Sequence, residues 1–291
     1  MVTLLREHYQ GMKHWVEYLQ TRTDDKGIVV REEPNGWCLG EWSTPHNRIE
    51  IPASLVNTAY FYHVTCIMAD VAGILNKKND EHHLRTLAET IRKNFNAAFY
   101  NEATHHYGEG KQGADVFALA FGLVPDGKRE KVFAALLGHL EKVNYHFDTG
   151  ILATPLLLQV LTENGRADLA YKLMNQRDFP SYGYLADKKN NTLWETWNGD
   201  GNDEGCGHCH PMFGSVVAWF YHSLAGIKPD QSDPGMKHFY IEPMIVPDLK
   251  YCRATYDSQY GKISSDWKID ENGNLNLSFV PMRYMQIHPL R

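Results

Sequence analysis

Apolar residues recur at the spacing of an amphipathic helix through most of the chain before residue 230. In the opening segment, residues 4–20, one helical face carries Leu5, Tyr9, Met12, Val16 and Leu19. Residues 54–75 are apolar nearly all round, which predicts a buried helix. Further helices are predicted at residues 82–100, 114–123, 129–143, 151–163, 166–176 and 210–227, and Pro211 suits the first position of the last one.

The links between these predicted helices are short and often contain glycine or proline, as in GLVPDGK and ENGRAD. Consecutive helices with short links pack as antiparallel helical hairpins. No motif repeats with a period of about 20–50 residues, so a closed array of helices is favoured over a regular solenoid. The pattern therefore predicts a mainly α fold.

After Pro229 the pattern changes to the alternation that is typical of strands. Asn272-Gly273 predicts a hairpin between the last two strands. We place a boundary near residue 232, between a helical domain at 1–231 and a β-domain at 232–291. Three to five strands are few for an independent sandwich, so we expect the β-domain to lean on the helical body.

Composition narrows the function classes only a little. The net charge of −6 and the lack of a Lys/Arg cluster argue against a nucleic-acid partner. The N-terminal segment resembles no signal peptide, and no stretch would span a membrane, so we expect a cytoplasmic protein. The cysteines are odd in number and scattered, which fits a reducing compartment better than a disulfide framework.

The segment TLWETWNGDG, residues 192–201, sets one carboxylate among aromatic rings. Glu195 lies between Trp194 and Trp197, and turn-forming residues follow. One interpretation makes Glu195 a general acid or base and the two tryptophans platforms on which a sugar ring stacks. The other makes Glu195 an exposed loop carboxylate and the tryptophans core residues, as aromatic side chains often are.

A second loop, NGWCLGEWSTP at residues 35–45, has the same composition and carries Trp37, Glu41 and Trp42. Binding sites are often built from loops held on a rigid scaffold, and a glycosidase needs two carboxyl groups. We therefore expect three segments to converge at one end of the helices: 35–43, 192–205 and 208–213.

The segment GCGHCHPMFG offers a competing interpretation as a metal site. Cys206 and Cys209 have CxxC spacing, with His208 and His210 beside them. Four donors within five residues can seldom all face one ion, and no second Cys/His pair follows. We therefore predict neither a metal nor another cofactor.

Two other polar segments are interpreted as structural. Asp148, in YHFDTGILATP, is expected to cap the helix that follows it. Residues 105–107, HHY, are expected on the solvated surface.

Several motifs together resemble the catalytic region of bacterial α-L-rhamnosidases, and the resemblance covers nearly the whole chain. The motifs occur in the same order as in that family: GWCLGEW, FALAFGLVPDGK, DTGILATPLLLQVLTENGRADLAYKLM, NTLWETWNG, HPMFGSVVAWFYHSLAGIKPD, KHFYIEP and YDSQYGKISSDWKI.

The resemblance implies an (α/α)6 barrel of six helical hairpins followed by a β-domain. It implies an inverting hydrolase that releases terminal rhamnose from glycosides and needs no cofactor. Glu195 would be the general base, and His210 would contact the sugar. Trp37, Trp42 and Trp197 would line its pocket.

The chain also departs from the family pattern. The general acid of the family lies in a motif upstream of GWCLGEW, which REEPNGW at residues 31–37 only mimics. Glu41 is the only residue of this chain that we name as a replacement for that acid. About eight helices are predicted, whereas six hairpins require twelve. We therefore expect a barrel that is incomplete at its N-terminus, with apolar helix faces that favour self-association.

Three functions compete at this point. The first is a rhamnosidase, whether or not this chain is active alone. The second is a carbohydrate-binding remnant without turnover. The third is another six-hairpin inverting glycosidase, such as a glucoamylase-like enzyme.

Overall fold

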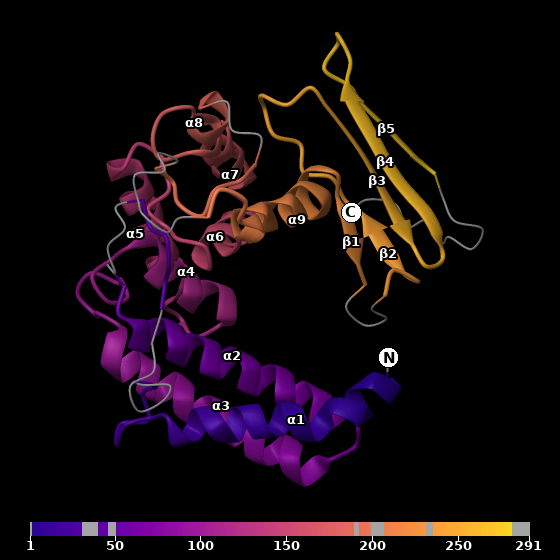
Figure 1. Cartoon of the computed structure of the whole chain (residues 1–291). Helices are drawn as coiled ribbons and strands as arrows, with labels where there is room; N and C mark the ends of the chain where they lie inside the picture. The colour runs from indigo at the N-terminus through magenta and orange to yellow at the C-terminus, as the bar shows by residue number, and fades with distance from the viewer. Residues whose placement is uncertain are drawn as a thin grey trace.

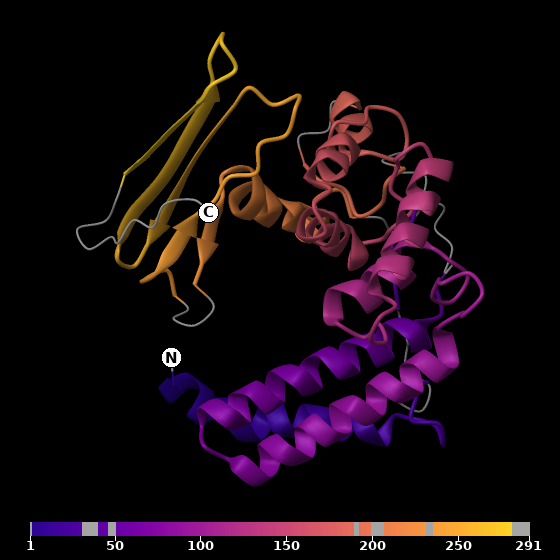
Figure 2. The ribbon, with the colours of Figure 1, turned by 180° about the vertical axis from the view of Figure 1, so that it is seen from behind.

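The computed structural model describes residues 2–30, 40–45, 51–188, 192–198, 207–230 and 235–280. Within these ranges the helices come first and the strands last. The helices follow an arc, and the strands stand at the other end of the arc from α1 (Val2–Thr21), as Figures 1 and 2 show. The prediction of a mainly α chain followed by a short β segment is confirmed.

Three long helices form the first arm of the arc (Figure 1): α1, α2 (Ala53–Ile74) and α3 (Lys78–Phe99). Residues on every side of α2 are buried, including Leu55, Phe61 and Met68, as its all-round apolar sequence predicts. Helix α2 contacts both α1 and α3, which each bury one face.

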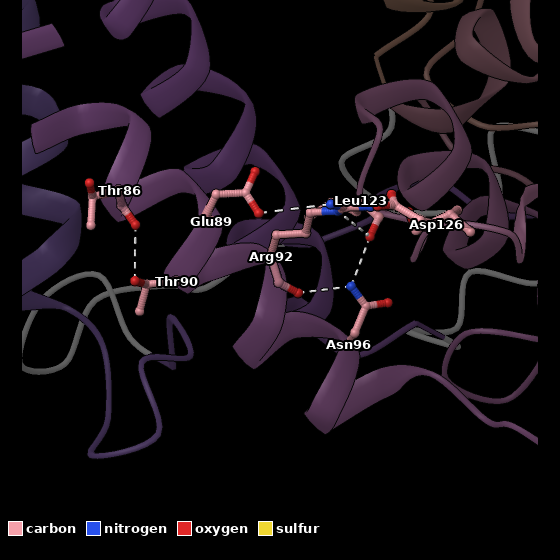
Figure 3. Close-up of polar contacts among 8 residues, drawn as sticks. Thr86, Glu89, Thr90, Arg92, Asn96, Leu123 and Asp126 are labelled. Atoms are coloured by element: carbon pink, nitrogen blue, oxygen red, sulfur yellow. Dashed lines mark hydrogen bonds and ion pairs between the residues drawn. The ribbon is translucent and has the colours of Figure 1, made fainter. Parts of the chain in front are cut away.

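Polar contacts fasten α3 to the turn after α4 (Gln112–Phe121), as Figure 3 shows. Asn96 donates to the carbonyl oxygen of Leu123 over 2.7 Å, and Arg92 donates to that of Val124 over 2.7 Å. Arg92 also bonds Asp126 over 2.8 Å. These side chains satisfy carbonyl groups of the turn, which have no partner within a helix.

The remaining helices complete the arc, and most match a predicted segment. They are α5 (Arg129–Lys142), α6 (Ala153–Glu163), α7 (Ala167–Met174), α8 (Tyr182–Asp187) and α9 (Val217–Trp219). The short helix α8 is missing from the prediction because six residues carry too little periodicity; Ser181 caps it by accepting the N–H of Tyr184. The described residues hold fewer than the twelve helices of six hairpins.

The helix predicted at 210–227 is only partly correct. Pro211 does occupy the first position, but the segment consists of a 3₁₀ turn (Pro211–Val216), the single turn α9 and a π-turn (Phe220–Leu224). Gly214 and the β-branched pair Val216 and Val217 all disfavour regular α-helix.

The expectation that residues 105–107 lie on solvated surface is wrong. Tyr107 is fully buried, and its backbone N–H donates to Asp115 over 2.8 Å. His106 bonds the other oxygen of the same buried carboxylate over 2.6 Å. This polar segment packs against the protein interior because the buried carboxylate of Asp115 requires hydrogen-bond donors.

Among the described residues, five strands form two antiparallel sheets. The first pairs β1 (Ile227–Pro229) with β2 (Phe239–Ile241). The second contains β3 (Tyr251–Ser258), β4 (Gly261–Ile269) and β5 (Leu275–Val280). The predicted Asn272-Gly273 hairpin joins β4 to β5, which confirms it. Strand β1 lies on the helical side of the boundary placed near residue 232.

The larger sheet leans on the helical body, as expected. Trp267 is fully buried and donates its indole N–H to the carbonyl oxygen of Leu224 over 2.7 Å. Ser265 donates to Ala225 over 2.7 Å. Ile263 packs with Ala225 and Ile227 in a small core of its own. The sheet is therefore joined to the end of the last helical segment.

An apolar groove of about 510 Å³ runs between α1 and α2. Met12, Trp15, Ile67 and Val71 are among the residues that line it. Trp15 is 52% exposed and Ile67 46% exposed.

In the described part of the chain, no helix is both long and apolar enough to cross a membrane.

Exposed apolar surface of this kind favours association, so we expect the chain to form oligomers as its concentration rises. Replacing Trp15 with glutamate places a charge in the groove and should return the chain to a monomer. Sedimentation velocity over a range of concentrations measures this. Tyr251→Glu, which changes a 65% exposed side chain on β3, is the control and should associate like the wild type. A wild-type monomer at all concentrations would contradict the expectation.

Candidate active site

The Glu195 loop and the His210 loop run alongside each other. The backbone N–H of Glu195 donates to the carbonyl oxygen of Gly207 over 2.9 Å, and that of His210 donates to Leu193 over 2.8 Å. The hydroxyl of Thr192 also donates to the carbonyl oxygen of His208. This antiparallel pairing brings Glu195 and His210 together, although fifteen positions separate them.

The carboxylate of Glu195 is held by the same pairing. Its Oε2 accepts the N–H of Gly207 over 2.7 Å, while the residue as a whole is half-buried. A Cβ on Gly207 would lie 3.1 Å from that oxygen and 3.7 Å from Cδ2 of His210. The glycine thus lets the carboxylate and the imidazole approach the same stretch of backbone.

The imidazole ring of His210 has one nitrogen that makes no hydrogen bond to the described residues. Its Nδ1 is buried and has no hydrogen-bond partner among the described residues. A buried polar atom without a partner costs stability, so such an atom beside a candidate base suggests a site for a polar ligand.

The two tryptophans of the Glu195 loop have different surroundings. Trp194 is half-buried and stacks on His208, with ring centroids 4.2 Å apart. Trp197 is fully buried, and Phe147 stacks on it at 5.1 Å. Its indole N–H donates to the carbonyl oxygen of Thr149 over 2.9 Å. Neither face of the Trp197 ring is open to a sugar in this structure. Trp197 therefore anchors the loop in the core.

The second loop is described only from residue 40 to 45, so Trp37 lies outside the described residues. Trp42 is 39% exposed, and its carbonyl oxygen accepts the N–H of Ile151 over 2.9 Å. Glu41 is 2% exposed. One of its oxygens accepts the N–H of Gly150 over 2.6 Å and that of Ala153 over 3.1 Å.

One short stretch of backbone, residues 148–153, therefore holds both loops. Thr149 accepts the indole N–H of Trp197, and the next two residues, Gly150 and Ile151, donate to Glu41 and Trp42. Consecutive Cα atoms are about 3.8 Å apart, so the two loops meet within a few ångströms. The structure thus brings the 40–45, 192–198 and 207–210 segments to one place.

Asp148 keeps this stretch in position, but not as expected. Instead of capping the helix that follows it, Asp148 accepts the N–H of Gln112, the first residue of α4, over 3.1 Å. Its other oxygen bonds Nε2 of His139 over 2.5 Å. The expectation failed because the carboxylate serves a helix that is distant in sequence. Neither Gln112 nor His139 carried a sequence signal for this role.

Burial dominates the electrostatics of Glu41 and raises its pKa from 4.5 to about 7. The N–H groups of Ala153 and Gly150 act in the opposite direction because they stabilise the charged form. The charge of Asp148 raises the pKa further. Glu41 therefore titrates near neutral pH, although no solvent reaches it.

The structure gives no support to a metal site at the Cys/His segment. The described residues contain no group of three His, Cys, Asp or Glu side chains placed to hold an ion. Cys206 lies outside them. The exposed ring of His208 is stacked on Trp194.

Comparison with known proteins agrees with this architecture. Residues 2–224 match the bacterial alpha-L-rhamnosidase 6 hairpin glycosidase domain, and residues 226–281 match the bacterial alpha-L-rhamnosidase C-terminal domain. The chain belongs to the bacterial α-L-rhamnosidase six-hairpin glycosidase family.

Relatives of this rhamnosidase family resemble the chain in sequence and in structure. An alpha-L-rhamnosidase from Formosa agariphila is 31% identical over an alignment of 285 residues, and the match covers 96% of this chain and 30% of that protein. The structure of Streptomyces avermitilis alpha-L-rhamnosidase complexed with L-rhamnose has a TM-score of 0.85 at 32% identity, covering 96% of this chain and 26% of that one. The structure of alpha-L-rhamnosidase from Dictyoglumus thermophilum has a TM-score of 0.84 at 34% identity, covering 93% and 30%.

The chain thus spans 26% to 30% of the length of these relatives.

The burial of Trp197 leads to a stability prediction. Trp197→Ala should lower the free energy of unfolding by about 3–5 kcal/mol, because it leaves a large cavity. Trp197→Phe keeps much of the packing but removes the donor to Thr149, so it should cost less. Urea unfolding of both variants measures the effect. Trp15→Ala is the control, and a loss for Trp197→Ala no larger than that of this control would contradict its core position.

The pKa of Glu41 leads to a prediction about pH. Because its pKa is higher in the folded chain than in the unfolded one, its contribution to stability is fully present below about pH 4.5 and is lost as the pH rises through about 7. Against Glu41→Gln, which does not titrate, the wild type should lose up to about 3 kcal/mol of unfolding free energy between about pH 5 and about pH 8. Urea unfolding at several pH values tests this, and parallel curves for the two proteins would refute it.

Proposed function

We propose that this chain carries the general-base side of the active site of an α-L-rhamnosidase, which removes terminal α-L-rhamnose from glycosides by inversion. The observation that carries the proposal is the pairing of the Glu195 and His210 loops, in a chain of this family. The substrate is accordingly a rhamnose-containing glycoside or oligosaccharide. The activity is proposed for the whole protein, because this chain covers only 30% and 26% of the length of these relatives.

Glu195 is the proposed base. In an inverting glycosidase the base takes a proton from the water that attacks the anomeric carbon, while an acid protonates the leaving oxygen on the other side. One oxygen of Glu195 accepts the N–H of Gly207, which fixes the direction of the carboxylate. The half-buried position leaves room for a water on the other oxygen.

His210 and the two partly exposed tryptophans are the proposed sugar-binding groups. The unpartnered Nδ1 of His210 can bond a sugar hydroxyl, which would satisfy a buried polar atom. Trp42 and Trp194 keep part of their rings accessible and can pack on the apolar face of a deoxy sugar. Glu41 is unsuited to direct contact because it is buried and bonded to backbone.

Glu41 is for the same reason unsuited to act as the general acid. The acid and base of an inverting enzyme stand about 6.5–9.5 Å apart with the sugar and water between them, so the acid must be open to the substrate. We infer that the acid belongs to a part of the protein other than the 40–45 loop.

Two other functions would use the same residues. A carbohydrate-binding protein without turnover would retain the sugar contacts and lack only the acid. Another six-hairpin inverting glycosidase would differ in the sugar that it accepts. A panel of aryl glycosides, assayed beside the rhamnoside, separates these alternatives from the rhamnosidase.

Glu195→Gln should lower turnover by about 10²–10⁴-fold, because an amide cannot take a proton from water. Dinitrophenyl α-L-rhamnoside is the substrate of choice, since its leaving group departs without an acid. L-rhamnose binding, measured by calorimetry, should stay nearly unchanged in this variant. Glu141→Gln on the exposed face of α5 is the matched control.

The same assay distinguishes the role of His210. His210→Ala should weaken L-rhamnose binding by about three- to tenfold, the effect of losing one polar contact.

Proton NMR of the first product should reveal β-L-rhamnose if the reaction inverts. Wild-type turnover in Glu195→Gln would remove Glu195 as the base, and absence of rhamnose binding by the wild-type chain would count against the whole proposal.

A further inference from the structure

We propose that Glu41 is a positioning residue, which fixes Trp42 for contact with the sugar by bonding the 40–45 loop to the first turn of α6. This inference rests on the proposed function, because it takes Trp42 as a sugar-binding ring. It assigns to Glu41 a role at one remove from the substrate.

The bonds of Glu41 and Trp42 converge on backbone donors at the start of α6. Oε1 of Glu41 accepts from Gly150 and Ala153, and the carbonyl oxygen of Trp42 accepts from Ile151. Gly150 and Ile151 precede α6 and Ala153 is its first residue, so their N–H groups have no partner within the helix and are available to a neighbouring loop. Three such bonds from two consecutive residues leave the backbone of Trp42 little freedom.

Two glycines allow the loop to approach this closely. A Cβ on Gly150 would lie 1.7 Å from the carbonyl oxygen of Trp42, where no side chain fits. Gly40 has a φ of +64°, and its Cβ would lie 2.8 Å from Cα of Ala53 in α2. The loop is thus held between α2 and α6, and only its Trp42 side chain extends outward.

Burying the Glu41 carboxylate costs stability, which indicates a role for this residue beyond packing. Oε2 of Glu41 is buried without a hydrogen-bond partner among the described residues. Burial of the carboxylate also raises its pKa to about 7, which means that the folded chain stabilises the charged form less well than water does. An apolar side chain would avoid both costs but would accept neither N–H group.

Direct contact between Glu41 and a sugar is incompatible with this geometry. The side chain is 2% exposed, whereas Trp42 beside it is 39% exposed. Glu41 can therefore act on the substrate only indirectly, and Trp42 is the exposed side chain next to it.

Amide NMR of the ligand-free chain tests the positioning directly. The indole N–H resonance of Trp42 is assigned by its loss in Trp42→Phe. We expect it to shift or broaden in Glu41→Ala and to stay close to the wild type in Glu41→Gln, whose amide oxygen can still accept both N–H groups. Glu41→Asp, shorter by one methylene, should give an intermediate result and replaces the alanine variant if that one does not fold.

Thr162→Val is the matched control. Thr162 lies in the last turn of the same helix, and its hydroxyl accepts the indole N–H of Trp219 over 2.7 Å. This variant should move the Trp219 resonance and leave that of Trp42 in place. An unchanged Trp42 resonance in Glu41→Ala, or an equal shift in Thr162→Val, overturns the inference.

Binding of L-rhamnose by the chain gives the second readout. Glu41→Ala should bind about two- to tenfold more weakly, the range expected for losing one aromatic contact, and Glu41→Gln should restore the affinity. A loss of stability in Glu41→Ala without a change in affinity overturns the link to the sugar. If the wild type binds no L-rhamnose, the proposed function fails, while the indole resonance still decides whether Glu41 positions Trp42.

Discussion

The candidate site depends on a single stretch of backbone, residues 148–153, whose polar groups serve two loops at once. The carbonyl oxygen of Thr149 holds the indole of Trp197, while the N–H groups of Gly150 and Ile151 hold Glu41 and Trp42. These loops are about 150 positions apart in the chain, so local sequence preference cannot bring them together. Their convergence requires that α6 begins at this place and that its first N–H groups remain open to partners.

Beneath the loops lies an aromatic cluster that resists movement. Trp197 is packed against Phe147, Tyr182 and Phe213, with ring centroids between 4.5 and 5.2 Å apart. Large rings in close contact allow few alternative arrangements, so the loop above them has one position. The carboxylate of Glu195, two residues before Trp197, gains its fixed direction from this support and from Gly207. A residue buried beneath the loop can thus determine where the proposed base points.

The sequence predicted the helices well and the roles of individual side chains less well. Seven predicted helices appear because apolar periodicity reports which face is buried, and α8 was missed because six residues are too few for that signal. Periodicity does not report depth, so Trp194 and Trp197 could not be told apart. Their difference arises from Phe147 and Thr149, which arrive from another part of the chain. Asp148 and residues 105–107 were misjudged for the same reason, since their partners are distant in sequence.

The arrangement also separates binding from turnover. The groups proposed to hold the sugar, His210 and Trp42, and the proposed base, Glu195, are all fixed by contacts among the described residues. Protonation of the leaving oxygen needs a further carboxyl group on the other side of the sugar, and Glu41 is excluded by its burial. On the proposed function, the groups that bind the rhamnose ring would include His210 and Trp42 of this chain. The rate of hydrolysis would depend in addition on the acid. Without the acid, the rate would fall most for glycosides whose leaving group is a poor one.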